Sequence, residues 1–486
     1  MTATEQKYTY ARASALRDDG RLGLETCGGT ALLAGPASHP RFFTGFVTEP
    51  GPAAAGLLAV AQVAAERYFL TAAQHPCDPV VTCHGDRLRF ESFSGDCGVY
   101  ARLDVLPESL DGQVHDRGTT NVDVNEPLRR SLARVSAMDR LHLTVGPDEL
   151  AVTTADGPVV EKKVPLPRRW LRGFAEVQVL LAGCDLRAEL GATEAERFVR
   201  SLPGGSIASG VTVSGARVTS GRWRGVHWLL PSGDTLRMTG GPAPGAVCLA
   251  GAHRLAALTP VLRYARALRV YGPAAGAGGQ PCPSAWELSL PGMRLTLALS
   301  PEAYRGFSGE GAVLDALADA TMDDADLVGA LLAFEPRVEV GLLADRGGLP
   351  SARVRRALVR LGTAGRVGYD LAEAAYFHRE LPYEAALAER DNPRLRNARA
   401  LVAAGAVALD GDLATVTSGD HVQRVRFAAD GAADSAAGGA ATCTCDWHAK
   451  HRGSRGPCKH VLAATMARAR QRADAARQAA NTSPAS

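Results

Sequence analysis

The chain has 486 residues, of which 46% are hydrophobic, so it can bury the cores of several domains, and its composition excludes a disordered or fibrous protein. Its 54 basic and 51 acidic residues nearly balance, and a net charge of +3 excludes a polycation, so any nucleic-acid binding must rest on a local patch. The first 21 residues are polar and charged, and the apolar stretch at 53–65 is too short to span a bilayer, so we expect a cytoplasmic protein without membrane contact.

Ten cysteines are present, and seven of them are scattered without regular spacing: Cys27, Cys77, Cys83, Cys97, Cys184, Cys248 and Cys282. Because the chain is large and has no export signal, we expect these seven to be reduced, mostly buried thiols. A second metal site is the alternative for four neighbouring residues, although their spacing matches no firm ligand pattern: Cys77, Cys83, His84 and Cys97.

Residues 1–118 predict an N-terminal α/β module of unknown role. The Ala-, Leu- and Val-rich run over residues 53–68 is typical of a helix, and residues 88–93 are typical of a strand. Clusters of Pro and Gly around these runs indicate loops.

Residues 119–300 predict a β-rich domain, because short runs alternate apolar and polar residues, as half-buried strands do. These runs are residues 141–145, 211–213, 288–290 and 295–297. Thr193 and Glu196 have the spacing of a capping box and predict a helix over 193–202, and the Gly-, Ala- and Pro-rich stretch 273–283 predicts a linker. Asp123, Asn125 and Glu126 could be a catalytic cluster, but the following Pro127 favours a strand end.

Residues 312–400 predict a helical, winged-helix-like domain. Asp323, Asp324 and Asp326 precede an apolar run and indicate a capped helix start rather than a metal site. A helix over 351–361 is followed by glycines and an extended segment, which is the order of a helix-turn-helix and its wing.

Four arginines share the 351–361 helix with an apolar face: Arg353, Arg355, Arg356 and Arg360. The helix could be a recognition helix in a DNA major groove. It could equally be a packing helix with an exposed basic side, and the sequence leaves both interpretations open.

Residues 401–480 predict a last, small unit. Residues 416–427 have the pattern of a β-hairpin with a tight turn, and the Ala- and Arg-rich run 461–480 is typical of a helix. Between them lies a Cys-x-Cys pair, Cys443 and Cys445, and twelve residues later a Cys-x-His pair, Cys458 and His460.

This cluster predicts a closed zinc site. Residues two apart on a strand point to the same face, so Cys443 and Cys445 can address one ion. Cys458 and His460 are expected at a helix start, where the helix dipole helps to ionise the Cys458 thiol. Three thiolates and one imidazole complete a tetrahedron, which is typical of one structural Zn²⁺ ion, while His448 and His451 remain rival fourth ligands.

The same residues resemble the SWIM zinc finger. Cys-x-Cys, a spacer and Cys-x-His form its signature, and the detail 456–462 (Gly-Pro-Cys-Lys-His-Val-Leu) resembles the long bacterial, actinobacterial-like branch. Residues 376–382 and 392–395 resemble the region upstream of the finger in that branch. The resemblance covers at most the last fifth of the chain.

The expected protein is thus an α+β multidomain chain with a β-rich middle, a winged-helix-like segment and a C-terminal ββα-type SWIM finger. The resemblance implies a zinc-dependent module for binding protein or DNA, and partners in a system of a MoxR-type AAA ATPase with a von Willebrand A-domain protein. We expect an adaptor that binds protein and is not an enzyme. A DNA-binding protein using the winged-helix-like segment and the basic finger is one alternative, and an enzyme with an unrecognised site in residues 1–300 is another.

Overall fold

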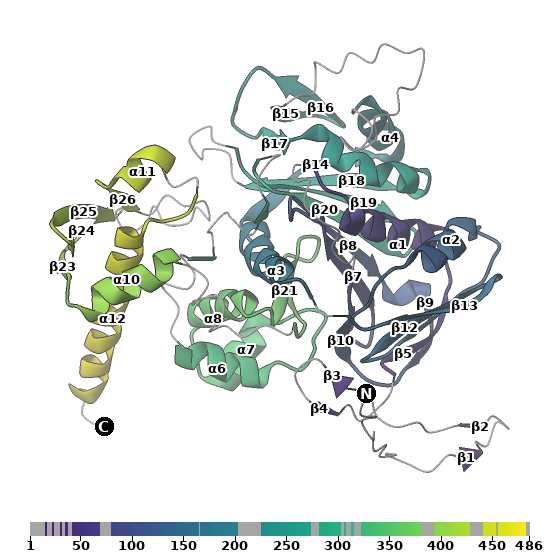
Figure 1. Cartoon of the computed structure of the whole chain (residues 1–486), viewed down its shortest axis with the longest axis horizontal. Helices are drawn as coiled ribbons and strands as arrows, with labels where there is room; N and C mark the ends of the chain where they lie inside the picture. The colour runs from purple at the N-terminus through teal and green to yellow at the C-terminus, as the bar shows by residue number, and fades with distance from the viewer. Residues whose placement is uncertain are drawn as a thin grey trace, which may run out of the picture.

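A computed structural model describes most of residues 41–482 and four two-residue strands before them. The gaps after residue 41 are residues 69–78, 165, 203–224, 274–280, 303–305, 308–312, 315–321, 382–392, 428–440 and 453–454. Among the early strands, β1 (Ala15–Leu16) pairs with β2 (Leu22–Gly23), and β3 (Thr30–Ala31) pairs with β4 (Gly35–Pro36). Figure 1 shows a large body built on sheets and a smaller C-terminal module beside it.

The large body is built on one antiparallel eight-stranded sheet in the order β10-β6-β7-β8-β20-β19-β18-β14. Its strands are β6 (Val80–Cys83), β7 (Leu88–Phe93), β8 (Val99–Val105), β10 (Gly118–Asn121), β14 (Cys184–Gly191), β18 (Ala267–Pro273), β19 (Ser284–Leu290) and β20 (Met293–Leu299). Strands from both sides of residue 118 hydrogen-bond within this sheet, at the β8–β20 pair. The predicted boundary at residue 118 therefore runs through a single sheet.

Two smaller sheets extend this body. The first has the order β13-β12-β11-β5-β9, and the second has the order β16-β15-β17. Their strands are β5 (Phe43–Val47), β9 (Leu110–Val114), β11 (Leu141–Val145), β12 (Glu149–Thr154), β13 (Gly157–Lys162), β15 (Val226–Ser232), β16 (Thr235–Thr239) and β17 (Val247–Ala250). The predicted strands at 141–145, 288–290 and 295–297 are present, and the one at 211–213 lies outside the described residues.

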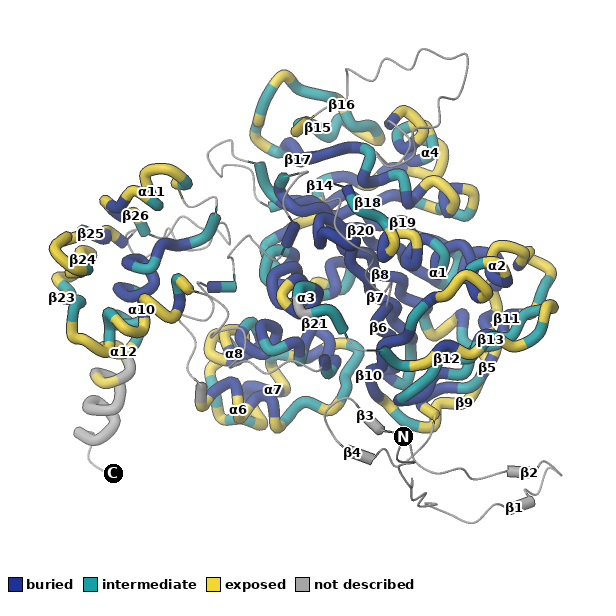
Figure 2. Tube along the Cα trace, viewed as in Figure 1, coloured by how far each residue is buried: buried dark blue, intermediate teal, exposed yellow. Residues whose placement is uncertain are grey.

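Strand alternation gives the large sheet two different faces. In β8, Val99, Ala101 and Leu103 belong to the main apolar core, whereas the alternate residues Arg102 and Asp104 are turned to the opposite face. Figure 2 shows that β7, β8 and β20 are buried along most of their length. The core on the first side is closed by four helices: α1 (Pro50–Ala65), α2 (Glu126–Arg134), α4 (Ala192–Ser201) and the 3-10 helix η2 (Ala252–Tyr264). A short 3-10 turn, η1 (Pro107–Ser109), precedes β9.

Two predicted helices begin earlier than their sequence signals suggest. The helix expected at residue 53 begins at Pro50, because proline is tolerated in the first turn, where its missing N–H needs no partner. The expected capping box at Thr193 does not form, since α4 begins at Ala192 and its N-cap residue is Gly191. Glu126, from the candidate acidic cluster, is the first residue of α2.

Helix α3 (Arg168–Leu181) covers the aromatic end of the second sheet face. Phe174 of α3 contacts Phe93 edge-on, with ring centroids 4.9 Å apart, and Tyr100 packs beside them. The rest of this face is covered by a helical domain of α6 (Met322–Leu331), α7 (Val340–Gly347), α8 (Ser351–Thr363) and a hairpin of β21 (Val367–Asp370) with β22 (Ala375–His378). Helix, turn and hairpin follow in the predicted winged-helix order, and we call the β21–β22 hairpin the wing.

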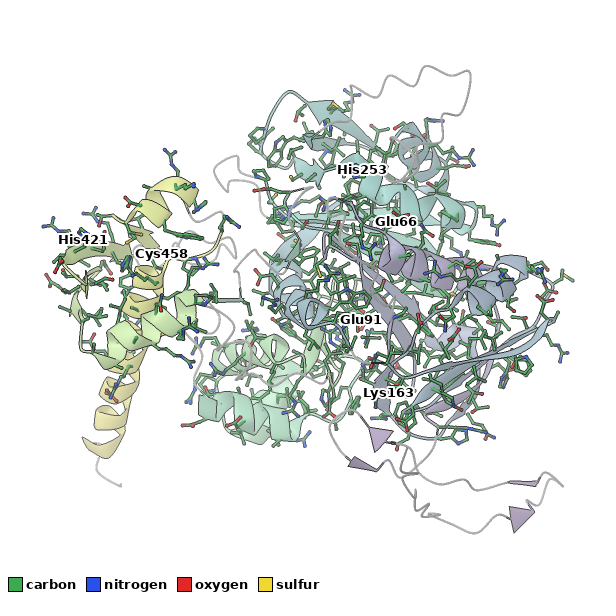
Figure 3. The ribbon with its side chains drawn as sticks, in the orientation of Figure 1. Glu66, Glu91, Lys163, His253, His421 and Cys458 are labelled. Atoms are coloured by element: carbon green, nitrogen blue, oxygen red, sulfur yellow. The ribbon has the colours of Figure 1, made fainter. Side chains whose placement is uncertain are left out.

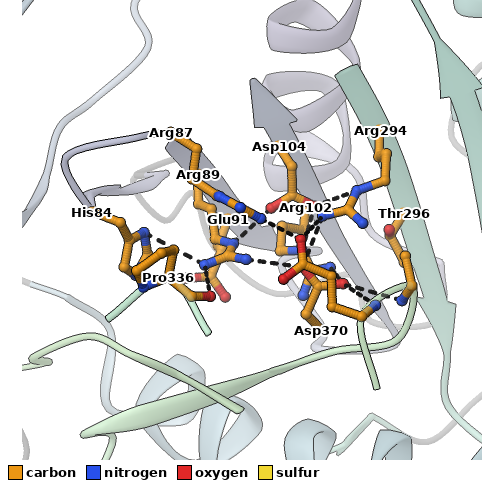
Figure 4. A network of polar contacts seen from close by, with 12 residues as sticks. His84, Arg87, Arg89, Glu91, Arg102, Asp104, Arg294, Thr296, Pro336 and Asp370 are labelled. Carbon is orange, nitrogen blue, oxygen red and sulfur yellow. Dashed lines mark hydrogen bonds and ion pairs between the residues drawn. The ribbon is translucent and has the colours of Figure 1, made fainter. Parts of the chain in front are cut away.

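A buried charge cluster joins the wing to the sheet (Figure 4). Asp370 at the end of β21 enters between Arg89 of β7, Arg102 of β8 and Arg294 of β20, with N–O distances of 2.9, 3.2 and 2.9 Å. We call these three arginines the arginine socket. Burial raises the pKa of Asp370, but the arginines outweigh that effect and hold the pKa well below its usual range.

The C-terminal module holds α10 (Pro393–Ala403), the sheet β23-β24-β25-β26, and helices α11 (Asp446–His451) and α12 (Lys459–Thr482). Its strands are β23 (Val407–Asp410), β24 (Leu413–Ser418), β25 (His421–Phe427) and β26 (Ala441–Cys443). The predicted hairpin and final helix are both present. Because α10 packs on α12 within one core, the module begins before the predicted boundary at residue 401.

Across the residues that the structure describes, no helix is long and apolar enough to cross a membrane.

Candidate metal site

The first two predicted ligands lie where β26 ends. Burial alternates along residues 441–445, so that Cys443 and Cys445 face inward while Thr442 and Thr444 face outward. Cys445 keeps an extended backbone and is the residue before α11. The strand geometry therefore directs both thiols to one side, as the Cys-x-Cys spacing predicts.

The other two predicted ligands lie at the start of α12. Cys458 precedes the helix, its carbonyl accepts the Leu462 amide, and its Sγ lies 3.4 Å from the amide nitrogen of Val461. An N–H at a helix start stabilises a thiolate, because the first amides have no partner within the helix. His460 follows in the first turn, and its Nδ1 lies 3.9 Å from Cys443 Sγ and 4.0 Å from Cys458 Sγ.

Together these four side chains form a buried group that could hold a metal ion. Their ligand atoms all lie within 4.8 Å of one another, and it is the single such group among the described residues. A tetrahedral zinc site with the usual bond lengths places sulfur and nitrogen ligands about 3.6–3.8 Å apart. The observed sulfur–nitrogen separations are close to this value, so the donor set fits zinc. Figure 3 labels Cys458 inside the module.

The thiol protons in this group depend on one another. The Cys443 thiol donates a hydrogen bond to Cys458 and lowers the pKa of Cys458 to about 3, while the same contact raises the pKa of Cys443. Burial raises the pKa of Cys445. One thiolate is thus held by the protons of its neighbours, and a bound cation would replace those protons and let all three thiols ionise.

The rival fourth ligands lie outside this group. The His451 ring lies against Trp447, with centroids 4.4 Å apart. His448 belongs to α11, which places it between Cys445 and the end of that helix. Of the three histidines, His460 is the one whose ring nitrogen reaches the thiols.

Arg394, whose role the sequence did not reveal, supports the ligand loop. Its Nη1 donates to the carbonyls of Arg455 and Pro457, at 2.6 and 3.0 Å, directly before Cys458. Its guanidinium also lies over the Trp447 ring, 4.8 Å from the centroid. Trp447 is partly buried and packs against the module core. The sequence signal for this support is the segment 392–395, which resembles the region upstream of the finger.

The candidate recognition helix α8 is only partly accessible. Arg353, Arg355 and Arg356 are exposed, and Arg353 pairs with Asp324 of α6. The C-terminal half is buried against α3, where Gly362 lies directly under the Gln178 amide. The wing is buried as well, since Phe377 and Asp370 are at most 1% exposed.

The remaining thiol candidates do not form a second metal site within the described part of the chain. Cys83 donates to the carbonyl of Asp116, and Cys97 donates to that of Arg169. His84 contacts the carbonyl of His378 at 2.6 Å. Cys77 lies outside the described residues.

Comparisons with known proteins identify no family. No family model matches the sequence, and no curated protein matches it. Among solved structures, the chain is similar to a Proliferating Cellular Nuclear Antigen from Entamoeba histolytica, with 11% identity and a TM-score of 0.33 over 54% of this chain and 99% of that one. It is also similar to a PCNA2-PCNA3 complex from Sulfolobus tokodaii, with 10% identity and a TM-score of 0.35 over the same shares. Likenesses this weak carry no argument about function.

Proposed function

We propose that the C-terminal module is a SWIM-type zinc finger that uses one structural Zn²⁺ ion and binds a protein partner. The observation that carries this proposal is the buried group of Cys443, Cys445, Cys458 and His460 between a strand end and a helix start. Three thiolates and an imidazole fill a tetrahedral zinc ion and leave no position for a reacting water. The role we propose for the metal is therefore to hold the module together.

The charge of the module supports an acidic partner. Residues 393–486 contain 13 basic and 7 acidic residues, whereas the other residues contain 41 and 44. The small excess of positive charge in the chain is thus concentrated in this module. Such a concentration favours encounters with acidic surfaces.

The outer face of the module sheet offers a surface for that partner. Arg424 and Arg426 of β25 are exposed there, and Leu413 and Val422 beside them are 42% and 60% exposed. Figure 1 places β23, β24 and β25 on the side of the module away from the large sheet, and Figure 3 labels His421 at the same edge. Exposed apolar residues beside arginines are more useful for binding a protein surface than for binding a phosphate backbone. The outward positions of β24 and β25 also hold no Phe, Tyr or Trp that could stack on bases.

Binding of DNA through the winged-helix-like domain has less support. Its wing is occupied by the arginine socket, and half of α8 packs on α3. The family resemblance instead favours a protein partner from a system of a MoxR-type ATPase and a von Willebrand A-domain protein. In such a system we propose that this chain acts as an adaptor, a role that requires no catalytic site.

The test measures both partner classes with the same zinc-loaded full-length protein. We expect a MoxR-type ATPase or von Willebrand A-domain protein of the same organism to bind, and Arg424→Glu with Arg426→Glu to weaken that binding while zinc content stays the same. Arg197→Glu with Arg200→Glu on α4 gives the matched control, since those arginines are also exposed.

Binding to duplex DNA is measured in parallel by fluorescence anisotropy at increasing salt. We expect only weak binding at physiological salt. Sequence-selective DNA binding at about 10⁻⁸–10⁻¹¹ M under those conditions, the range of specific DNA binders, would replace the adaptor proposal by that of a transcription factor.

A further inference from the structure

The arginine socket is built by the large sheet itself. Asp104 of β8 pairs in register with Arg89 on one side and with Arg294 on the other, and Arg102 lies two residues along β8 on the same face. Asp104 accepts hydrogen bonds from the Nε atoms of Arg89 and Arg102, at 2.8 and 2.9 Å. These contacts fix the two side chains and leave their Nη2 atoms for another anion.

The other acids of this sheet face have partners of their own. Glu91 accepts hydrogen bonds from Tyr100 and Arg379, and Glu287 accepts one from Thr296 at 3.0 Å. Burial raises the pKa of Glu287, which favours its neutral form. The three arginines of the socket therefore outnumber the sheet carboxylate that is hydrogen-bonded to them, and a further negative charge stabilises the group.

Asp370 of the wing supplies that charge but does not use every donor of the socket. Its Oδ2 accepts hydrogen bonds from Nη2 of Arg89 and of Arg294, both at 2.9 Å, while its Oδ1 accepts two amides of its own turn. Arg102 Nη2 and Arg294 Nε make no hydrogen bond with any described residue, although the two side chains are more than nine-tenths buried. Buried donors without a partner are unfavourable, so the carboxylate is an incomplete fit.

A phosphate group fits these donors better than a carboxylate does. A carboxylate has two oxygens in one plane, whereas the phosphate of a monoester has three outer oxygens and a charge of about −1.5 to −2 near pH 7. Arginine forks are common partners of both groups. Because the three arginines come from three neighbouring strands, they reach the anion from different directions, and each can contact a separate oxygen of a tetrahedral group.

The turn of the wing controls access to the socket (Figure 4). Arg294 is the most exposed of the three arginines and lies at the rim. Glu373, from the same turn as Asp370, pairs with Arg294 at 3.3 Å and with Arg87. A ligand that reaches the socket must therefore displace both carboxylates of this one turn.

The backbone that carries the wing is strained at two positions. Ala374 in the turn has a φ of 46°, and Phe334, whose amide donates to His378 of β22, has a φ of 55°. These values lie in the left-handed region, which is unfavourable for both residue types. Such a backbone persists where surrounding contacts hold it, so release of the wing relieves strain and lowers the cost of displacing Asp370.

We propose that the arginine socket is a binding site for a phosphate group, and that Asp370 occupies it when no ligand is bound. The wing and the phosphate exclude each other, so binding moves the wing away from the sheet. The phosphate is either free or part of a nucleotide. The Phe377 ring of β22 lies over the Arg89 guanidinium, 4.0 Å from its carbon, and a nucleotide base can take that position when the wing leaves.

The test titrates the zinc-loaded full-length protein with inorganic phosphate by isothermal calorimetry, with ionic strength held constant by potassium chloride. Asp370→Asn keeps the shape of the side chain and removes the competing charge. Apparent affinity falls with the fraction of molecules in which the site is open, so we expect this variant to bind one phosphate at least about tenfold more tightly than the wild type.

Hydrogen–deuterium exchange of the wild-type protein gives a second measurement that does not depend on the stability of the variant. Saturating phosphate should increase exchange in β21 and β22, because the ligand displaces the wing. The same ionic strength of potassium chloride should not. Exchange that phosphate leaves unchanged, or reduces, would overturn the proposal.

Two further variants show whether the phosphate binds in the socket. Arg294→Gln, added to Asp370→Asn, should abolish saturable binding, because it removes a donor at the rim. Asp156→Asn breaks an exposed ion pair with Arg134 and should bind phosphate no better than the wild type. The absence of saturable binding to a folded Asp370→Asn variant, or binding that survives Arg294→Gln, would rule the site out.

Adenosine monophosphate distinguishes the two sources of the phosphate group. Tighter binding of this nucleotide than of inorganic phosphate to Asp370→Asn would identify a nucleotide site. Equal or weaker binding would identify a site for free phosphate.

Discussion

The large sheet body and the C-terminal module keep their folds by different means. The body draws its core from strands between residues 43 and 299, and the opposite face of its large sheet buries a cluster of charges. The module has a much smaller core, and three of its buried members are the candidate ligands Cys443, Cys445 and Cys458. A small unit buries little apolar surface, so we expect the module to depend on a bound ion for its stability and the body not to.

The buried polar groups of the two regions also find their partners in different ways. In the body, Asp370 and the arginine socket form ion pairs with one another and are buried. In the module, the thiols have each other, the His460 ring and the Val461 amide as partners. We therefore expect single substitutions to act locally and strongly in the module, and through the wing contact in the body.

Among the substitutions predicted here, the loss of a metal ligand should reduce the stability of its region the most. Structural zinc supplies about 10–16 kcal/mol of apparent binding free energy in zinc-finger peptides, so Cys445→Ser should release the ion and unfold the module. Hydrogen–deuterium exchange should show loss of protection in β24, β25 and the first turns of α12, and no change in β8 and β20. A common loss of protection in both regions would show that the body depends on the metal too.

The fourth ligand can be identified in the same assay. His460→Ala should weaken zinc binding far more than His448→Ala or His451→Ala, since its Nδ1 lies about as far from two thiols as a tetrahedral site requires. Zinc competition with a chromogenic chelator measures the difference. A larger loss for His451→Ala would move the ligand assignment to that residue.

Removing the charge that pairs with the arginine socket should cause the next largest loss of stability. Asp370→Asn keeps the shape of the side chain but leaves three buried arginines short of a negative charge, and breaking a buried ion pair costs about 3–5 kcal/mol. Urea denaturation should show this loss. Asp156→Asn is the matched control, because Asp156 pairs with Arg134 where both side chains are exposed, and such pairs contribute at most about 1 kcal/mol. Equal losses for the two variants would mean that the wing is not held by the socket.

The sequence predicts the grouping of the four candidate ligands and the hairpin well, because both depend on residues close together in the chain. Cys443 and Cys445 are placed by strand alternation, and Cys458 by the helix that follows it. The socket could not be predicted in this way. Its three arginines come from three strands, and Asp370 lies about 75 residues or more from each, so only the assembled sheet brings them together.

Other features were missed for the same reason. The packing of β17 against the large sheet is one of them, since a Cβ on Gly272 of β18 would lie 3.7 Å from the Val247 side chain although 25 residues separate the two. The boundary expected at residue 118 was placed by a change of pattern, while the hydrogen bonds of the sheet connect β8 to β20 across it. Sequence periodicity reports the type of an element but not its neighbour in a sheet.

A substitution at the contact between α8 and α3 should change the free energy of unfolding by a smaller amount. Its sign tells whether the two helices are packed together. Alanine normally stabilises a helix by about 1 kcal/mol relative to glycine. At Gly362, however, a Cβ would lie 1.6 Å from the Gln178 Nε2 atom, so Gly362→Ala should cost about 1–3 kcal/mol, as overpacking does.

Gly341 on α7 gives the matched control, because a Cβ there meets nothing within 4 Å. Gly341→Ala should be neutral or stabilising in urea denaturation, and Gln178→Ala should relieve the cost of Gly362→Ala. A stabilising Gly362→Ala would mean that α8 is free of α3, and the recognition-helix interpretation would regain its support.

Acid should weaken the contact between the wing and the sheet through two buried histidines. Burial lowers the pKa of His378 to about 3, helped by Arg366, and burial also holds the pKa of His84 well below its usual range, helped by Arg89. In both cases the folded protein binds fewer protons than the unfolded chain. Stability is therefore complete above the unfolded pKa of about 6.5 and falls by about 1.4 kcal/mol per pH unit and histidine below it.

His378→Asn isolates one of these two contributions. The asparagine oxygen can replace Nδ1 as the acceptor of the Phe334 amide, which lies 2.7 Å away, but it cannot take up a proton. Between pH 4.5 and 6, which is above the range where an unfolded aspartate such as Asp370 titrates at about 3.9, the slope of unfolding free energy against pH should fall by about 1.4 kcal/mol per unit. His421→Asn at the exposed edge of β25 should leave the slope unchanged. If His378→Asn also left it unchanged, His378 would have to be reachable by water in the folded state, and the wing would not be packed on the sheet as tightly as its burial indicates.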